Sequence, residues 1–285
     1  MKLDFSTAAG IRDLIATKNE TRLRETDFDE ITLGAVIELA CTDVSWKLRT
    51  DPTWKVWYTT LCSRFHDLDL ATRALRISSI NSSLAVPRRD IPVEIHCLRK
   101  REDFEGNGWV SFQENFVKRA QKCGFKKDFA YALTGAFAEI AENVPDHSAA
   151  RGTPMAPALI GYHIVPNEVH FAVGDIGRGA LESLRENSRW DGLENSRQAL
   201  EAILWSHATR KATHEEGGGF NQVWKSFLDR NGTVAVHSGD AYGKALIITG
   251  ARQQNTGFRA FLPGFRVCAS CLLKGLPAET GLKSG

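Results

Sequence analysis

Two apolar, β-prone runs that lie close together along the chain most constrain its fold. They are Ala158–Val165 (ALIGYHIV) and Val169–Val173 (VHFAV). Pro166 and Asn167 separate them, and a short break of turn residues between two such runs is typical of a β-hairpin. We therefore predict that a sheet built around this hairpin forms part of an α/β protein.

Helical periodicity precedes the hairpin. Val110–Cys123 has the apolar spacing of a short helix, with Gly124 as its C-terminal stop. A second helix is expected from about Asp128. Its buried stripe is Leu133, Phe137, Ile140, Ala141 and Val144.

The second helix also carries polar residues. Glu139 and Asn143 lie one turn apart and share a face. This pair could lie beside a cleft, or it could belong to an ordinary solvated acidic face. Pro145 should kink the helix just beyond Asn143, so Glu142, Asp146 and His147, which are also polar, are expected to be ordinary surface residues.

The second run of the hairpin leads into Asp175-Ile176-Gly177-Arg178-Gly179. A carboxylate at a strand end can accept a hydrogen bond from an exocyclic amine, and glycines let the main chain approach a flat ring such as adenine. A plain glycine turn capped by Asp175 is the alternative.

Residues 180–216 are polar, with helices predicted over Leu181–Asn187 and Leu193–Trp205. Gly217, Gly218 and Gly219 then open an amphipathic helix over Asn221–Arg230. Glycines at a helix start offer N–H donors to an anion such as phosphate, although they could also form a hinge.

Three further strands are predicted near the C-terminus, over Thr233–His237, Ala245–Thr249 and Phe258–Leu262. Turns are expected at Ser238-Gly239-Asp240, Gly243 and Gln254-Asn255, and Pro263-Gly264 should end the last strand.

The first hundred residues contain no motif that indicates a known chemistry. A helix is expected over Asp27–Leu48 with Asp27 as its cap, and a strand over Ile91–Leu98. Between them, aromatic residues at helical spacing after Pro52 indicate core or a subunit contact rather than a ligand site. We place a soft boundary near Asn107–Trp109.

Composition narrows the class of protein. The 285 residues are 42% hydrophobic and carry a net charge of +2, so a real core is possible and no strong polyanion-binding field is implied. No apolar run approaches the roughly 18 residues of a membrane span, and the start lacks a signal-peptide core. We expect a soluble, cytoplasmic protein with no nucleic-acid or membrane partner. Its six cysteines, including Cys268 and Cys271, should be reduced thiols.

Taken in order, these motifs resemble the GHKL superfamily of ATP-binding domains with the Bergerat fold, closest to those of histidine kinases and anti-sigma-factor kinases. The boxes that carry the resemblance are Glu139-x-x-x-Asn143, Asp175-x-Gly177-x-Gly179, Gly217-Gly218-Gly219 and Thr256-x-Phe258-x-x-x-Leu262-Pro263. The last glycine box departs from the family pattern by ending in Phe220.

The resemblance implies a role for each box. Asn143 would bind the Mg²⁺ that bridges the phosphates, and Glu139 would orient or deprotonate the attacking water. Asp175 would accept the adenine amine, with Gly177 and Gly179 lining the base pocket and Thr256 assisting. Residues 180–216 would form a mobile lid in which Lys211 could reach the γ-phosphate, and Gly217, Gly218 and Gly219 would contact phosphate.

We therefore expect an N-terminal mixed α/β domain over residues 1–109, a two-layer α/β ATP-binding domain with a mixed sheet and helices on one face over residues 110–267, and a C-terminal tail over residues 268–285. The expected function is Mg²⁺-dependent ATP binding with slow hydrolysis, acting as a conformational switch toward a protein partner or a second subunit. A serine/threonine kinase of the anti-sigma-factor type and a non-catalytic nucleotide-binding scaffold are the alternatives.

Overall fold

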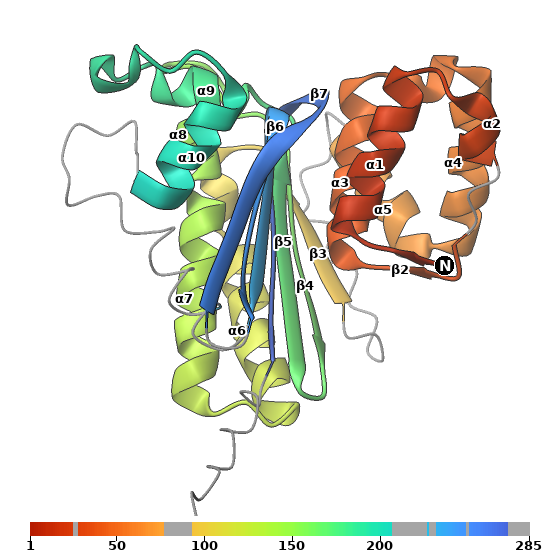
Figure 1. Cartoon of the computed structure of the whole chain (residues 1–285). Coiled ribbons are helices and arrows are strands. Elements are labelled where there is room, and N and C mark those ends of the chain that lie inside the picture. The colour runs from red at the N-terminus through yellow and green to blue at the C-terminus, as the bar shows by residue number, and fades with distance from the viewer. Residues whose placement is uncertain (25–27, 77–92, 207–226, 228–231, 249–250, 273–285) are drawn as a thin grey trace, which may run out of the picture.

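A five-stranded antiparallel sheet runs through the molecule (Figure 1). The structure, a computed structural model, describes residues 1–24, 28–76, 93–206, 227, 232–248 and 251–272. Across the sheet the strands are β3 (Val93–Leu98), β4 (Ala158–Val165), β5 (Glu168–Asp175), β7 (Ala251–Leu272) and β6 (Thr233–Ile248). A separate parallel pair joins β1 (Lys2–Leu3) to β2 (Glu30–Ile31).

The mixed α/β class is confirmed, but the expectation of a mixed main sheet is wrong. Two of its pairs, β4 with β5 and β6 with β7, are formed by strands that follow each other directly along the chain. Short connections of this kind can only join antiparallel neighbours. β3, which precedes the expected domain boundary, also pairs antiparallel with β4 and so belongs to the same sheet.

The central hairpin is confirmed. Val165 pairs with Glu168 across a turn in which Asn167 has a φ of 69°, a conformation that asparagine tolerates better than most residues. β5 continues past Val173 to Asp175, so the carboxylate of the expected adenine box is the last residue of the strand.

Helices α6 (Asn107–Lys122) and α7 (Lys127–Glu142) cover one face of the sheet, where the apolar periodicity predicts them. Gly124, with a φ of 94°, follows the end of α6. The aromatic rings in the core between these helices and the sheet include Phe112, Phe116, Phe137, Tyr162 and Phe171. On the same side lie α9 (Gly179–Leu184), the 3₁₀ turn η3 (Ser188–Trp190) and α10 (Ser196–Ser206).

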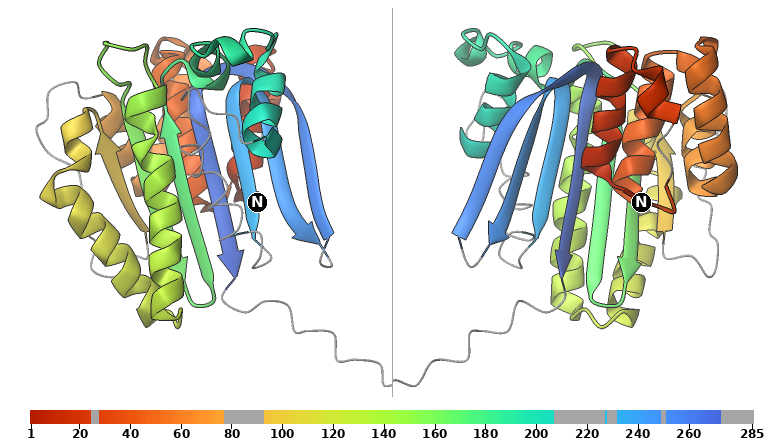
Figure 2. Two further views of the ribbon diagram at one scale, coloured as in Figure 1. Left: turned by 90° about the vertical axis from the view of Figure 1, so that its left-hand side faces the viewer. Right: turned by 45° about the vertical axis from the view of Figure 1, so that its right-hand side comes forward.

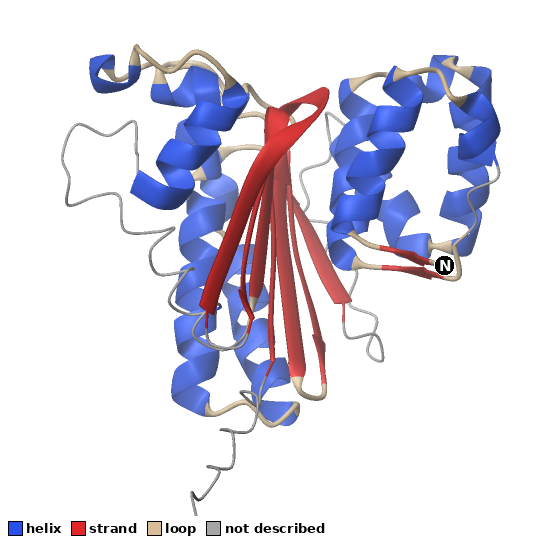
Figure 3. Ribbon diagram, in the orientation of Figure 1, coloured by secondary structure: helices blue, strands red, loops and turns tan. Residues whose placement is uncertain are grey.

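The opposite face of the sheet is covered by N-terminal helices, so helices lie on both faces (Figures 2 and 3). They are α1 (Phe5–Ala16), α3 (Leu33–Ser45) and α5 (His66–Arg76), with α2 (Glu20–Arg24) and α4 (Pro52–Arg64) beside them. β4 explains this second layer, because Leu159 is buried with the N-terminal helices and Ile160 with α6 and α7. A strand that is apolar on both faces requires a cover on both.

Helix α3 is shorter than predicted. It begins at Leu33, after Thr32 accepts a hydrogen bond from the main-chain N–H of Ala35. Glu30 and Ile31 form β2 instead of a first helical turn. Asp27, the expected cap, lies outside the described residues.

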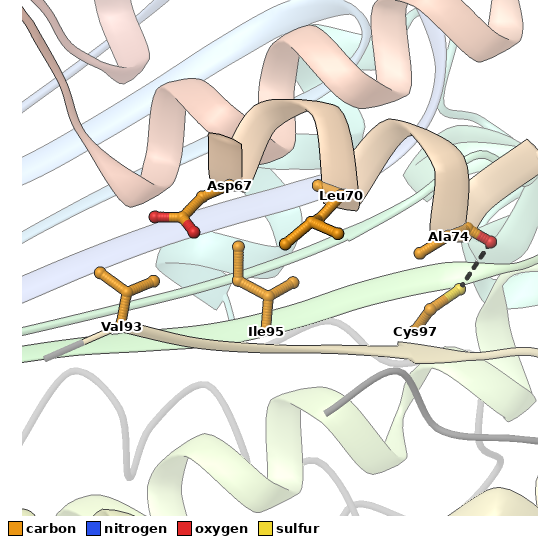
Figure 4. A pocket seen from close by; sticks show the side chains of 7 residues that line it. Asp67, Leu70, Ala74, Val93, Ile95 and Cys97 are labelled. Carbon is orange, nitrogen blue, oxygen red and sulfur yellow. Dashed lines mark hydrogen bonds between the residues drawn. The ribbon is translucent and has the colours of Figure 1, made fainter. Parts of the chain in front are cut away.

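The aromatic segment after Pro52 forms α4 and belongs to the core, as predicted. Trp54 is buried, and its indole N–H donates to Oδ1 of Asp43 at 2.9 Å. Next to it, α5 packs over β3 (Figure 4), where the Cys97 thiol donates to the carbonyl of Ala74 at 3.5 Å. The cavity between these two elements is about 20 Å³, which is too small for a metabolite.

β6 and β7 form a long bent ribbon instead of three short strands. The register shifts around Gly239, which has a φ of 58°, and Gly264 opposite has a φ of 93°. Glycines at these two places therefore bend the ribbon without ending its pairing. Turns at Gly243 and Gln254-Asn255 were predicted wrongly, because both segments are paired.

The C-terminal part of the chain also corrects the predicted tail. β7 continues through Pro263 to Leu272, so residues 268–272 pair with β5. All six cysteines are free thiols, as expected. Within the described ranges, no helix has both the length and the apolar character that crossing a membrane requires.

Candidate functional site

The expected metal-binding helix ends where the candidate site begins. α7 stops at Glu142, and a short helix, α8 (Val144–His147), restarts around Pro145. Proline has no N–H for the helix ladder but is tolerated in a first turn. The predicted interruption at Pro145 is therefore confirmed.

Glu139 and Asn143 line the same cleft, which has a volume of about 650 Å³. Arg101 and Phe104 of the 3₁₀ turn η2 (Arg101–Phe104), together with Glu105, also line this cleft. The side chains of Glu139 and Asn143 form no hydrogen bond or ion pair with another described residue, although both are half-buried. They are available to a ligand entering the cleft.

The other polar residues of this region are engaged in the fold. Asp146 forms an ion pair with Arg101, and Glu142 accepts a hydrogen bond from the Trp109 indole at 3.4 Å. His147 lies with Nδ1 2.7 Å from the hydroxyl of Ser183 in α9. The three residues were expected to be ordinary surface residues; Glu142 is exposed, but Asp146 and His147 are half-buried and engaged in the fold.

Asp175 lies at the end of β5 and is 3% exposed. Burial raises its pKa from 3.8 to about 6, although hydrogen bonds from the main-chain N–H groups of Gly177 and Phe265 and the charge of Arg266 favour the ionised form. The bond from Gly177 to Oδ1 is 2.8 Å long. The carboxylate is therefore a hydrogen-bond acceptor held in a dry site.

Both glycines of the Asp175 loop allow close approach, but to the protein's own chain. A Cβ at Gly177 would lie 2.0 Å from the carbonyl oxygen of Ser148. Gly179 has a φ of 82°, and a Cβ there would lie 2.8 Å from the hydroxyl of Ser238. In this structure the glycines let the loop pack against Ser148, just after α8, and against Ser238 of β6.

Helix α8 joins the two motifs. The main-chain N–H of Arg178 donates to the carbonyl of Ser148 at 3.0 Å, and its Nε donates to the carbonyl of His147 at 3.1 Å. The Arg178 guanidinium also pairs with Glu186 at 2.6 Å. The segment that follows Asn143 and the loop that carries Asp175 are thus joined by one main-chain hydrogen bond and one hydrogen bond from the Arg178 side chain.

Thr256 lies elsewhere. Its hydroxyl donates to Glu201 of α10 at 2.6 Å and accepts from Nε of Arg197 at 3.1 Å. The structure therefore places Thr256 on α10 rather than against Asp175. Lys211, Gly217, Gly218 and Gly219 lie outside the described residues.

The cleft does not contain a ready-made metal cage. Across the described part of the chain, no group of three or more His, Cys, Asp or Glu side chains is arranged to hold a metal ion. Mg²⁺ keeps several waters and takes few protein ligands when it is bound with phosphates. A single neutral oxygen donor such as the Asn143 amide therefore fits Mg²⁺ that arrives with a nucleotide.

A buried charged cluster near Asp175 could not be found from motifs. It comprises Arg12, Glu38, His237 and Arg266. Glu38 is the centre, and its one available signal was a lone carboxylate within the apolar run LGAVIELAC. Its three partners come from α1, β6 and β7, which no local pattern connects.

Comparisons with known proteins do not assign the chain to a family. No family model matches it, and no curated protein matches its sequence.

Proposed function

We propose that this protein binds ATP with Mg²⁺ and hydrolyses it slowly. The proposal rests on the cleft that Glu139 and Asn143 both line, with side chains that bond no other described residue. Just after α8, which follows Asn143, Ser148 accepts a hydrogen bond from the Asp175 loop. An amide and a carboxylate one turn apart, about 6 Å between Cβ atoms, can act on a metal-bound phosphate and on a water.

Each residue has a distinct chemical task in this proposal. Asn143 supplies a neutral oxygen to the metal, which when bound offsets the negative charge of the phosphates. Glu139 accepts a proton from, or orients, the attacking water. Asp175 accepts a hydrogen bond from the adenine amine. Because the described chain supplies little beyond positioning, turnover should be slow.

Nucleotide binding in this site requires movement. Asp175 is 3% exposed and does not line the cleft of Glu139 and Asn143. An adenine ring reaches the carboxylate only when the surrounding loops open. Such opening and closing is what a switch that changes contacts with a partner protein or a second copy would use.

Titration of the purified full-length chain with ATP, with and without Mg²⁺, tests the proposal. Mg²⁺-dependent binding with one site per chain is the expected result, and the absence of binding would overturn it. The product then separates the reactions. Release of free phosphate supports hydrolysis, transfer of label to a protein serine or threonine supports a kinase, and binding without either supports a nucleotide-binding scaffold.

Replacing Glu139 by glutamine should separate binding from turnover. We expect Glu139→Gln to lower the hydrolysis rate by roughly 100-fold or more, because a general base typically contributes that much, while ATP affinity changes little. Single-turnover hydrolysis and calorimetric titration measure the two quantities. Glu142→Gln is the matched control, since Glu142 lines the same cleft but bonds Trp109. Loss of binding in Glu139→Gln would make Glu139 structural.

A further inference from the structure

The buried charged cluster of Arg12, Glu38, His237 and Arg266 lies on the sheet face that the N-terminal helices cover, which we call the back of the sheet. Through Arg266 it contacts the segment of β7 that packs against Asp175. Arg266 is fully buried, and its Nε lies 3.0 Å from Oε2 of Glu38 in α3. The other end of the guanidinium donates to the carbonyl of Pro263 at 2.6 Å and to that of Leu262 at 3.3 Å. One side chain therefore ties the bend of β7 to an N-terminal helix.

The same bend lies against Asp175. Gly264 approaches so closely that a Cβ there would lie 2.0 Å from the main-chain oxygen of Asp175 and 3.1 Å from its Oδ1. The next residue, Phe265, donates its main-chain N–H to the Asp175 carboxylate. The position of the bend thus determines the position of a donor that holds this carboxylate.

We propose that Arg266, anchored by Glu38, is a positioning residue for Asp175, so that the N-terminal helices on the back of the sheet help to set the group that accepts adenine. This inference rests on the proposed ATP-binding function. It gives residues 1–76 a task that the sequence leaves open.

Arg12 provides a matched comparison. It is as buried as Arg266 and donates to Oε1 of Glu38 at 3.0 Å, but no described contact joins it to the bend. Either Arg12→Met or Arg266→Met removes one of two guanidiniums from Glu38 and leaves one. Arg266→Met also removes the donor to the Pro263 and Leu262 carbonyls, so it should lose more stability than Arg12→Met, and only Arg266→Met releases the bend.

Among the described residues, two charged or titratable groups interact with Asp175. Arg266 of β7 favours its ionised form, and Cys41 of α3 is a neutral thiol whose pKa is raised by burial. Removing the Arg266 charge should therefore raise the pKa of Asp175 further. Because the adenine amine bonds more strongly to the ionised carboxylate than to the neutral acid, the acidic decline of ATP affinity should then begin at a higher pH.

Calorimetric titration with ATP between pH 5 and 8 tests the proposal, with thermal unfolding as a check on folding. We expect Arg266→Met to weaken ATP binding at least tenfold at pH 7.5 and to move the acidic decline of affinity to higher pH. The ATP affinity of Arg12→Met should stay within about threefold of the wild-type value, and the pH at which affinity declines should not change. Equal behaviour of the two variants would overturn the proposal.

Two further measurements separate the possible failures. If the wild type binds ATP and Asp175→Asn binds it more weakly, the adenine site is established independently of Arg266. Unchanged ATP affinity in Arg266→Met would then refute only the positioning role. If Arg266→Met does not fold, amide hydrogen exchange of the wild type with and without ATP tests the positioning role instead. ATP should protect residues 264–266 and α3 around Glu38 but leave α5 unchanged, and an unprotected α3 would refute the role.

Discussion

Glu38→Gln should lower the free energy of unfolding by about 3–5 kcal/mol, the usual cost of leaving buried charges without a partner. Glu38 is fully buried and lies within 3.0 Å of both Arg12 and Arg266. A neutral amide would leave two guanidiniums in the interior with no anion. Urea unfolding at neutral pH measures the loss, and the dependence on urea should keep its slope.

An exposed ion pair provides the control for Glu38→Gln. Glu30 pairs with Lys2 at 3.0 Å, but its side chain is 62% exposed. Glu30→Gln should therefore change stability far less, because exposed pairs contribute little. Equal losses in the two variants would show that the buried cluster is not a structural centre.

The effect of Glu38→Gln should also depend on pH. Burial raises the pKa of Glu38, but Arg266, His237 and Arg12 outweigh burial and hold it well below its ordinary value of 4.5. A lowered pKa contributes stability that is present above pH 4.5 and is lost as the pH falls toward the folded-state value. The gap between wild type and Glu38→Gln should therefore narrow in acid.

Asp175→Asn should weaken ATP binding while it stabilises the free protein. The asparagine oxygen can still accept a hydrogen bond but carries no charge, and bonds to charged groups are stronger by about 1–1.5 kcal/mol, so we expect affinity to fall roughly five- to tenfold. Calorimetric titration with ATP at pH 8, where Asp175 is ionised, measures this loss. Unchanged affinity would show that Asp175 does not hold adenine.

The stability gain follows from the raised pKa of Asp175. The folded protein holds this proton up to about pH 6, whereas the ordinary value is 3.8. The resulting stability is present below pH 3.8 and is lost as the pH rises through 6, so the ionised carboxylate costs the folded state about 2–3 kcal/mol. Asp175→Asn removes this cost.

Unfolding in urea without nucleotide, at pH 5 and pH 8, checks the sign. Asp175→Asn should gain more over the wild type at pH 8 than at pH 5. Asp191→Asn, at the exposed residue that follows η3, is the control and should show no such trend. A gain that is larger at pH 5 would contradict the assignment.

Local signals predicted much of the fold. The Pro166-Asn167 break predicted the hairpin, and Gly124 predicted the end of α6, because turns and helix stops depend on residues close in sequence. Pro145 likewise predicted the interruption of the polar helix just beyond Asn143.

The remaining features depend on contacts between residues far apart in the sequence, and these could not be predicted from local patterns. Gly239 and Gly264 carry turn signals, yet the ribbon bends there and keeps its partners, which sequence spacing does not reveal. Leu159 and Ile160 are both apolar, but nothing local shows that the N-terminal helices cover one of them. The buried partners of Glu38 come from distant elements, so this part of the candidate site was missed for the same reason.

The position of β7 constrains the order in which the chain can complete its fold. β7 is the last described strand along the chain, yet it lies between β5 and β6 in the sheet. β6 therefore has no partner, and Glu38 lacks Arg266, until β7 is in place. During synthesis from the N-terminus, β3, β4 and β5 can pair first, but β6 joins them in one sheet only after β7 has been made.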